Sequence, residues 1–397
     1  MGGILSNVRN NIIYSLSRQT DQLAKLQEQT ATGARINRVS DSPSEAYQVL
    51  TLDSQVSSLS TYITNLENTV STLGVSSEVI GSMMSDILST KTSLTQITGG
   101  IYNASQRQII ADKLDSVLQS MISFANTENS GQYLFGGTST STAPYLAQYT
   151  DGKITSVVYQ GSSEERSIEL APGVADCAFY VGDDIFSLDD RGDLSFIGAT
   201  TGVVQGEGTS SQKGYSWLEI SEPVSGTYRL TTDGGKSYVD VAVPPGDSNT
   251  KVTNSLTGEV LYLDTTGITG TGVELVNAEG TSDIFNTLIT IRDVFNNEKG
   301  LPDDQIEQMR LVTLDSIDET YSMLNSASTM IGSKISYLDN TKEMMTDLKY
   351  NAEDQTTLIE EADIAQIAID LTQIETLYQL SLSVAGKMMS MSLFDYI

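Results

Sequence analysis

The sequence contains no histidine and only one cysteine, Cys177. Without histidine, the chain lacks the commonest zinc ligand and general base, and one cysteine excludes an intramolecular disulfide. Acidic residues number 51 against 22 basic residues, which gives a net charge of −29. This excess of negative charge disfavours binding to nucleic-acid phosphates and to anionic lipid headgroups. We therefore expect a protein that is not an enzyme and that holds no metal and no cofactor.

Long hydrophobic runs are also missing, because nowhere do about 18 apolar residues follow one another. The first 18 residues are polar and interrupted, so we expect neither a Sec-type signal peptide nor a membrane span. One acidic cluster could serve a surface hydrolase as an alternative function, although such a cluster among glycines is more typical of a solvated turn or an incidental cation site. Its members are Asp183, Asp184, Asp189, Asp190 and Asp193.

Proline is scarce and unevenly placed, and glycine follows the same division. Residues 44–130 and 303–397 contain no proline, whereas residues 131–280 hold 22 of the 32 glycines and five of the seven prolines. Proline is the strongest obstacle to long helices. The chain also exceeds the roughly 250 to 300 residues that one hydrophobic core supports. We therefore predict two helical flanks around an inserted middle domain.

The first flank opens with the helix-start signal Ser42-Pro43-Ser44-Glu45, in which Ser42 can cap the helix and Pro43 suits its first position. Apolar residues then recur at alternating spacings of three and four, which places them on one helical stripe. At 1.5 Å per residue the helix from residue 49 to 101 would extend roughly 80 Å. Gly99-Gly100 should break it, and a second helix should return. The stripe comprises Val49, Leu52, Val56, Leu59, Ile63, Leu66, Val70, Leu73, Ile80, Met84, Ile87, Leu94 and Ile101, and the returning helix Ile110, Leu114, Val117, Met121 and Phe124.

The second flank repeats this pattern after a shorter helix between Ile284 and Phe295. Its stripe comprises Leu314, Ile317, Tyr321, Leu324, Ser328, Ile331, Ile335 and Leu338. Matching stripes in distant segments predict a mainly α fold, with a long coiled-coil-like helical bundle built from both chain ends. We assign residues 43–130 and 281–356 to this bundle.

The middle segment has the opposite character. Short β-prone runs at 154–159, 227–231 and 238–243 alternate with turn signals such as Asp233-Gly234-Gly235. This pattern is typical of strands joined by tight turns. We predict that residues 131–280 form a glycine-rich antiparallel β insert of one or two subdomains.

Both extreme ends, residues 1–42 and 357–397, carry helical stripes with nothing obvious to cover them. A pair of terminal helices would still leave much apolar surface in water, so we expect these stripes to bind partner subunits. Packing within the chain is the alternative. The partner-binding candidates are Leu16, Leu23, Leu26, Ile364, Ile367, Leu371, Ile374, Tyr378, Leu382, Ala385, Met389 and Leu393.

Several motifs are similar to those of one known family. The stretch from Thr32 to Pro43 resembles the signature shared by flagellins and flagellar hook-associated proteins, and 375–387 resembles their C-terminal signature. The stretch 132–138 and the ending 392–397 resemble the hook-filament junction branch, FlgL, more than flagellin. The motif residues are Gly33, Arg35, Ile36, Asn37, Ser40, Asp41 and Pro43, together with Phe135, Gly136 and Gly137.

The resemblance implies an extracellular structural protein of the bacterial flagellum, exported by the flagellar type III route. It further implies that the terminal helices form an inner tube domain and that the β insert faces outward. The implied partners are FlgK on the hook side, flagellin on the filament side, other copies in a ring, and the export chaperone FlgN. Flagellin itself is the nearest alternative.

Overall fold

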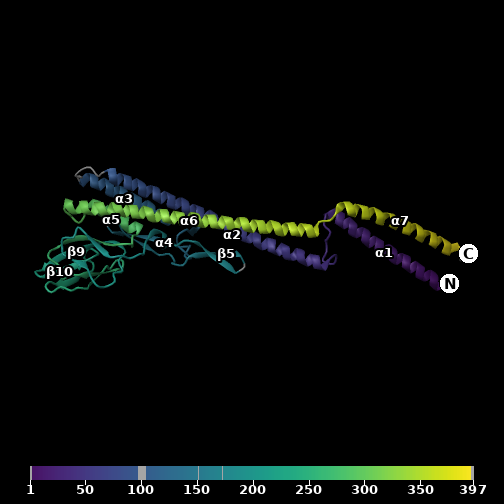
Figure 1. Cartoon of the computed structure of the whole chain (residues 1–397), viewed down its shortest axis with the longest axis horizontal. Coiled ribbons are helices and arrows are strands. Elements are labelled where there is room, and N and C mark those ends of the chain that lie inside the picture. The colour runs from purple at the N-terminus through teal and green to yellow at the C-terminus, as the bar shows by residue number, and fades with distance from the viewer. Residues whose placement is uncertain (1, 97–103, 151, 172, 395–397) are drawn as a thin grey trace. The chain divides into compact units, whose positions relative to one another are not determined.

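The structure is a computed structural model that describes residues 2–96, 104–150, 152–171 and 173–394. Two long helices dominate it, α2 (Pro43–Gln96) and α6 (Asp303–Glu360), as Figure 1 shows. Each begins at or next to a proline and contains none further along, so the hydrogen-bonded ladder runs on without interruption. The other helices are α1 (Gly2–Thr32), α3 (Ala104–Ala125), α4 (Gly182–Phe186), α5 (Ile284–Asn296) and α7 (Ile364–Phe394).

The chain divides into two compact units. Unit 1 comprises Met1–Thr64 and Asn340–Ile397, and unit 2 comprises Asn65–Asp339. Both boundaries of these units fall inside α2 and α6, and the predicted domain boundaries at residues 42 and 356 stay a prediction.

Unit 2 has a helical core in which the predicted stripe of α2 is buried. Leu66, Ile80 and Ile87 are fully enclosed, as are Leu324 and Leu338 on α6. At several positions the enclosed residue is the neighbour of the predicted one, such as Met83 instead of Met84, Leu118 instead of Val117 and Ala125 instead of Phe124. An apolar stripe on a helix is broad enough to include two adjacent residues, so packing against the neighbouring helix decides which of the two is enclosed. The predicted break at Gly99-Gly100 lies outside the described residues.

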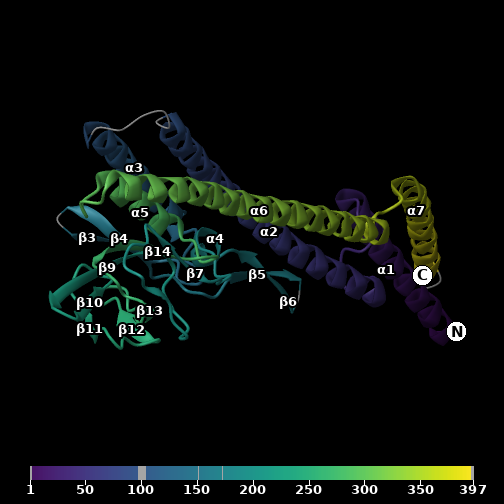
Figure 2. The same cartoon turned by 60° about the vertical axis from the view of Figure 1, so that its left-hand side comes forward.

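Helix α5 lies between α6 and the strands in Figures 1 and 2. Ten of its 13 residues are buried, because it contacts α3 on one side and strands on the other. A helix that is covered on all sides needs apolar residues around its whole circumference, and α5 has them. Its single arginine, Arg292, is enclosed and pairs with Asp115 of α3 at 3.0 Å.

The insert is a set of antiparallel sheets. A five-stranded sheet has the order β11-β10-β9-β14-β7, and a three-stranded sheet has the order β12-β13-β8. Side chains of both sheets meet in one hydrophobic cluster that includes Leu218, Leu230 and Leu263. The predicted strands appear as β4, β10 and β11. The strands are β1 (Glu128–Asn129), β2 (Gln132–Tyr133), β3 (Tyr145–Thr150), β4 (Lys153–Tyr159), β5 (Arg166–Ala171), β6 (Val174–Phe179), β7 (Leu194–Ile197), β8 (Val204–Gln205), β9 (Gly214–Val224), β10 (Thr227–Thr231), β11 (Val239–Ala242), β12 (Thr250–Thr253), β13 (Val260–Asp264) and β14 (Gly272–Ala278).

Unit 1 is built around the pair of helices α1 and α7, which contact each other along their lengths. They run in opposite directions, so the two chain ends lie at the same end of the pair (Figure 1). Among the described helices, none contains an apolar stretch long enough to cross a bilayer.

Candidate functional site

The loop that joins α1 to α2 and the loop that joins α6 to α7 are hydrogen-bonded to each other. Residues 33–42 join α1 to α2, and residues 361–363 join α6 to α7. The Arg35 N–H donates to the Glu360 carbonyl at 2.6 Å, and the Ala362 N–H donates to the Gly33 carbonyl at 3.1 Å. Ala34 and Glu361 form an antiparallel bridge between these bonds. We call residues 33–42 and 361–363 the clasp, because it ties both ends of the chain together.

Arg35 extends the clasp to both long helices. Its guanidinium donates to the Glu45 carboxylate on α2 and to the Ile359 carbonyl at the end of α6, each at 2.8 Å. The hydrogen bond from Arg35 lowers the pKa of Glu45. Planar guanidinium donors suit this double contact. The Arg35 and Glu45 side chains are 45% and 35% exposed, so solvent screens their attraction and the geometry matters more than the energy.

Asp41 orders the rest of the motif. Its carboxylate accepts from the backbone N–H groups of Asn37 and Arg38 at 3.2 and 3.0 Å, and it pairs with Lys25 at 3.1 Å. The hydrogen bond from Lys25 is the largest cause of the lowered pKa of Asp41. Gly33 has a φ of +73°, a left-handed conformation that favours glycine. The motif therefore forms an ordered turn held by these hydrogen bonds and by the Lys25–Asp41 ion pair.

The remaining motif residues have structural positions in or beside the clasp. Ile36 is buried, Ser40 is exposed, and Pro43 is the first residue of α2. The Asn37 side chain donates to the Ala34 carbonyl at 3.0 Å.

The second motif anchors the start of the insert. Phe135 packs edge-on against Phe186 with ring centroids 5.0 Å apart, and Tyr145 joins this pair to Phe285 of α5. Gly137 has a φ of +61°, and a Cβ there would lie 2.5 Å from the Ser162 carbonyl oxygen. Gly136 is similarly crowded by the backbone. Both glycines are thus required for close backbone approach beside an aromatic cluster.

The seam assigned to partners is largely used within the chain. On α1, Leu16, Leu23 and Leu26 are half-buried, as are Leu371, Ile374, Tyr378 and Ala385 on α7, while Ile367 is 7% exposed. Two amphipathic helices of one chain can cover each other's stripes, and this pair does so. Whether the seam also contacts partners stays a prediction. The side chains of Met389 and Leu393 lie outside the described residues.

A second apolar face of α7 remains uncovered. Ile369, Leu377, Leu380 and Val384 are 53%, 47%, 60% and 45% exposed, respectively. At 100° per residue these four positions share one side of the helix, about 120° from the seam. We call them the outer stripe. Ile364 and Leu382, each 46% exposed, lie at the margin of the seam. Ile369 was not among the predicted partner-binding residues, although the outer stripe forms a second apolar series with helical spacing in the sequence.

Among the described residues, no group of three or more Asp, Glu or Cys side chains could hold a metal ion. Asp183 and Asp184 lie in the short helix α4, and Asp189 approaches Lys213 at 3.9 Å.

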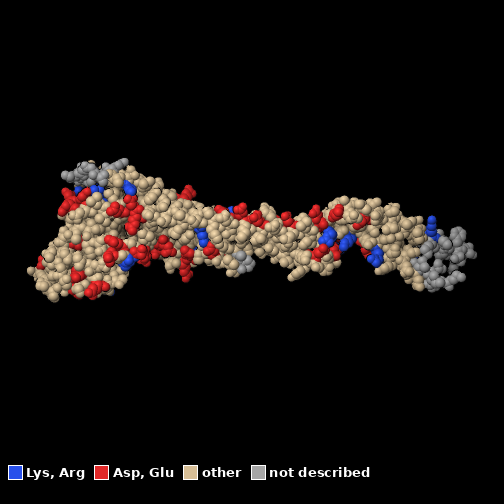
Figure 3. All heavy atoms as spheres, in the orientation of Figure 1, with Lys and Arg blue, Asp and Glu red and all other residues tan. Residues whose placement is uncertain are grey.

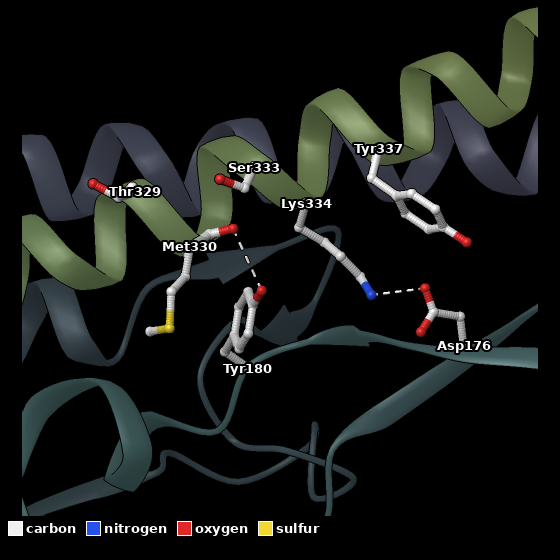
Figure 4. A pocket seen from close by; sticks show the side chains of 7 residues that line it. All are labelled: Asp176, Tyr180, Thr329, Met330, Ser333, Lys334 and Tyr337. Atoms are coloured by element: carbon white, nitrogen blue, oxygen red, sulfur yellow. Dashed lines mark hydrogen bonds and ion pairs between the residues drawn. The ribbon is translucent and has the colours of Figure 1, made fainter.

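An open groove between β6 and α6 is the other candidate for a small-molecule site (Figure 4). Lys334 pairs with Asp176 across it at 2.7 Å, and the Tyr180 hydroxyl donates to the Met330 carbonyl at 3.4 Å. These polar groups satisfy one another, and they tie β6 to the helix.

Comparison with known proteins assigns the N-terminal third. Residues 4–140, which include the first ten residues of the clasp and the Phe135 motif, match the family described as the bacterial flagellin N-terminal helical region. The chain is also 27% identical over 165 residues to flagellar hook-associated protein 3 of Escherichia coli (strain K12), an alignment that covers 41% of this chain and 49% of that protein. The match thus spans about half the length of this relative.

Solved structures support the predicted fold of the chain. It is similar to flagellar hook-associated protein 3 from Legionella pneumophila, with a TM-score of 0.53 and 14% identity over 78% of this chain and 98% of that one. A structure of the flagellar junction protein FlgL from the same organism gives a TM-score of 0.50 and 14% identity, covering 79% and 99%. The predicted mainly helical fold with an inserted β domain is confirmed.

Proposed function

We propose that this protein is a structural component of the flagellum that joins a FlgK layer on the hook side to the flagellin filament, and that it assembles through its terminal helices. The outer stripe of α7 carries the proposal. Four large apolar side chains on one face of a helix, each about half exposed, are costly in water. Burial against a neighbouring subunit removes that cost.

In this proposal, the terminal helices become ordered when the subunit assembles with its neighbours. Ordering a residue costs roughly 1 to 2 kcal/mol of backbone entropy. A two-helix pair with a half-buried seam offsets this cost poorly, whereas an added partner surface contributes about 25 cal/mol per Å² of apolar area. The clasp then holds the ordered pair to α2 and α6 through Arg35. Neighbouring copies, FlgK and flagellin are the partners in this proposal.

The proposal also includes export of the chain by the flagellar type III route, with FlgN holding the C-terminal apolar face beforehand. An uncovered stripe on α7 is a surface that such a chaperone could cover.

The test replaces the outer stripe in cells. A chain with Leu377→Gln, Leu380→Gln and Val384→Gln keeps good helix formers while removing the apolar face. Expressed in cells that lack the gene, it should be exported yet leave hooks without filaments, with flagellin shed into the medium. A control with Val224→Gln and Leu256→Gln, two exposed positions of the insert, should restore attached filaments. Normal filaments on the outer-stripe variant would overturn the proposal.

Flagellin is the second candidate, favoured by the family that residues 4–140 match. A filament subunit should polymerise alone into long filaments, whereas a junction protein should stop after a short layer because its next neighbour is a different protein. Electron microscopy of the purified chain at increasing concentration separates the two.

A further inference from the structure

The chain enters and leaves the strands β7 to β14 of the insert through two short segments. Residues 187–193 lead from α4 to β7, and residues 279–283 lead from β14 to α5. Backbone hydrogen bonds join the two segments, such as the bond that the Leu188 N–H donates to the Ser282 carbonyl at 2.8 Å. We call residues 187–193 and 279–283 the neck, because the chain passes through them on its way into and out of these strands.

Asp283 lies at the helix end of the neck. It is the N-cap of α5, and its carboxylate accepts a hydrogen bond from the Asn286 N–H at 2.7 Å. Its backbone forms an antiparallel bridge with Ser187, directly after α4. Asp283 thus joins the neck to the first turn of a helix that is buried along most of its length.

The charged groups that surround Asp283 are mostly acidic. The negative charges of Asp183 and Glu259 act on its carboxylate, whereas Lys213, a basic residue nearby, approaches the exposed Asp189 at 3.9 Å. Figure 3 shows that acidic side chains dominate over basic ones on the insert. The surroundings of Asp283 therefore oppose its negative charge. The titratable groups around it are Asp183 and Asp184 of α4, Tyr145 of β3, Tyr159 of β4, Glu259 before β13, Glu319 of α6 and Lys213 before β9.

Asp283 can change its charge near neutral pH. Burial raises the pKa of Asp283 from 3.8 to about 6, and the negative charge of Asp183 adds to this rise. The two phenols stay neutral in this range, because burial and the neighbouring carboxylates raise the pKa of Tyr159 to about 12 and the pKa of Tyr145 well above its usual value. A change of charge at this place is therefore a change at Asp283.

A buried hydroxyl beside these carboxylates lacks a partner. Tyr145 is 4% exposed, and its hydroxyl makes no hydrogen bond to the described residues. The hydroxyl lies against the start of α4, because a Cβ on Gly182 would come within 2.8 Å of its oxygen. An unsatisfied buried polar group destabilises the packing around it. The contact between α4 and β3 beside the neck therefore opens at a lower cost than a fully hydrogen-bonded contact would.

We propose that the neck is a pH-sensitive joint, held closed when Asp283 carries a proton and loosened when Asp283 and Asp183 are both charged. Asp283 binds its proton more tightly in the closed neck than in an open neck, where water surrounds the carboxyl group. By linkage, the closed neck then loses stability as the pH rises from 3.8 to about 6, and the loss is complete above that range. Acidification therefore tightens the attachment of the strands to α5. The isolated chain should show this behaviour, because it does not depend on assembly.

Hydrogen exchange of the full-length protein measures how often the neck opens. Peptides that cover residues 183–193 and 279–290 report on the neck, and a peptide that covers residues 73–87 of α2 serves as the internal reference. The rates are corrected for the intrinsic pH dependence of exchange. The opening constant of the neck should then be about ten-fold larger at about pH 7.5 than at about pH 5.0, the ratio expected for an aspartate with a pKa of 3.8 when open and about 6 when closed. The reference peptide should not show this change.

Three single substitutions assign the effect. Asp283→Asn keeps an oxygen that can accept from the Asn286 N–H, since asparagine and aspartate are equally good N-caps, but it carries no charge. At pH 7.5 its neck should open at least about ten-fold less than the wild-type neck, with no difference between the two pH values. Asp183→Asn removes one facing charge and should reduce the wild-type pH dependence by about two- to three-fold. Asp190→Asn removes the same charge from an exposed position of the neck and should behave as the wild type does.

Each outcome decides. A wild-type neck whose opening does not change with pH, or that opens less at pH 7.5, would overturn the inference. An Asp283→Asn variant that keeps the wild-type pH dependence, or an Asp190→Asn variant that loses it, would do the same. Unchanged protection of residues 73–87 shows that the helical core of a variant is intact. Where Asp283→Asn weakens that protection, Asp283→Ser, another uncharged N-cap, takes its place in the same test.

Discussion

The helical core of unit 2 and the α1–α7 pair of unit 1 are built from the same sequence pattern, yet they bury it to different degrees. Leu66 and Leu118 in unit 2 are completely enclosed, whereas Leu23 and Leu371 in the terminal seam remain half-exposed. In unit 2, for example, α5 contacts α3 and the strands β4 and β9. In the terminal pair only one other helix is available. Apolar periodicity thus predicts which face of a helix can be buried, while the number of neighbouring elements decides how much burial of that face stabilises the fold.

The two motifs differ in the same way. The clasp relies on exposed hydrogen bonds and ion pairs around Arg35 and Asp41, which water and salt weaken. The Phe135 motif relies on enclosed aromatic rings and on glycines packed against backbone. The first suits a connection that is completed by assembly. The second suits one that must hold in the isolated chain.

Hydrogen exchange should give the largest difference between the regions. In the isolated monomer we expect backbone amides of α1 and α7 to exchange on the order of 10³ times faster than those of residues 73–87 in α2, because helices with few enclosed contacts open locally at little cost. Limited proteolysis should likewise remove about 40 residues from each end first. Mass spectrometry of quenched samples measures the exchange. Equal protection in both regions would mean that the pair folds without partners.

Truncating one leucine in each region tests the same difference in burial. Leu66→Ala should lower the free energy of unfolding by about 3 to 5 kcal/mol, because it leaves a cavity in a closed core. Leu371→Ala should cost about 1 kcal/mol or less in the monomer, since water fills the space in a half-exposed seam. Denaturant titration followed by the fluorescence of Trp217, the single tryptophan, reports unit 2, and far-ultraviolet circular dichroism reports the helices. Comparable losses in both variants would contradict the distinction.

Substituting one glycine in each motif should have a smaller effect on stability. Gly33 and Gly137 both have positive φ, but a Cβ at Gly33 meets nothing within 4 Å, whereas one at Gly137 meets the Ser162 and Glu164 carbonyl oxygens at 2.5 and 2.7 Å. Gly33→Ala should therefore cost about 1 kcal/mol from backbone strain alone. Gly137→Ala should cost about 2 to 3 kcal/mol, as strain and the steric clash combine. Thermal unfolding of the pair of variants measures the difference, and a larger loss at Gly33 would reverse the assignment of roles.

Much of the fold could be predicted because the deciding signals are local. Absence of proline after Pro43 and Pro302 permits α2 and α6, and the three-four spacing from Val49 onward identifies the face that is buried. Tight turns such as Asp233-Gly234-Gly235 mark strand ends, since glycine adopts positive φ without strain. Each of these signals acts within a few residues along the chain, so the sequence determines it directly.

Tertiary structure decided the features that depend on distant segments. Arg35 reaches Ile359 across 324 residues of sequence, a contact that no spacing rule contains. The two sheets of the insert share one core because Leu230 and Leu263 meet across it. Likewise, α1 covers the seam of α7 and leaves the outer stripe exposed. Helical periodicity states which residues share a face, but packing alone decides which face receives a neighbour, and that choice leaves the outer stripe of α7 exposed.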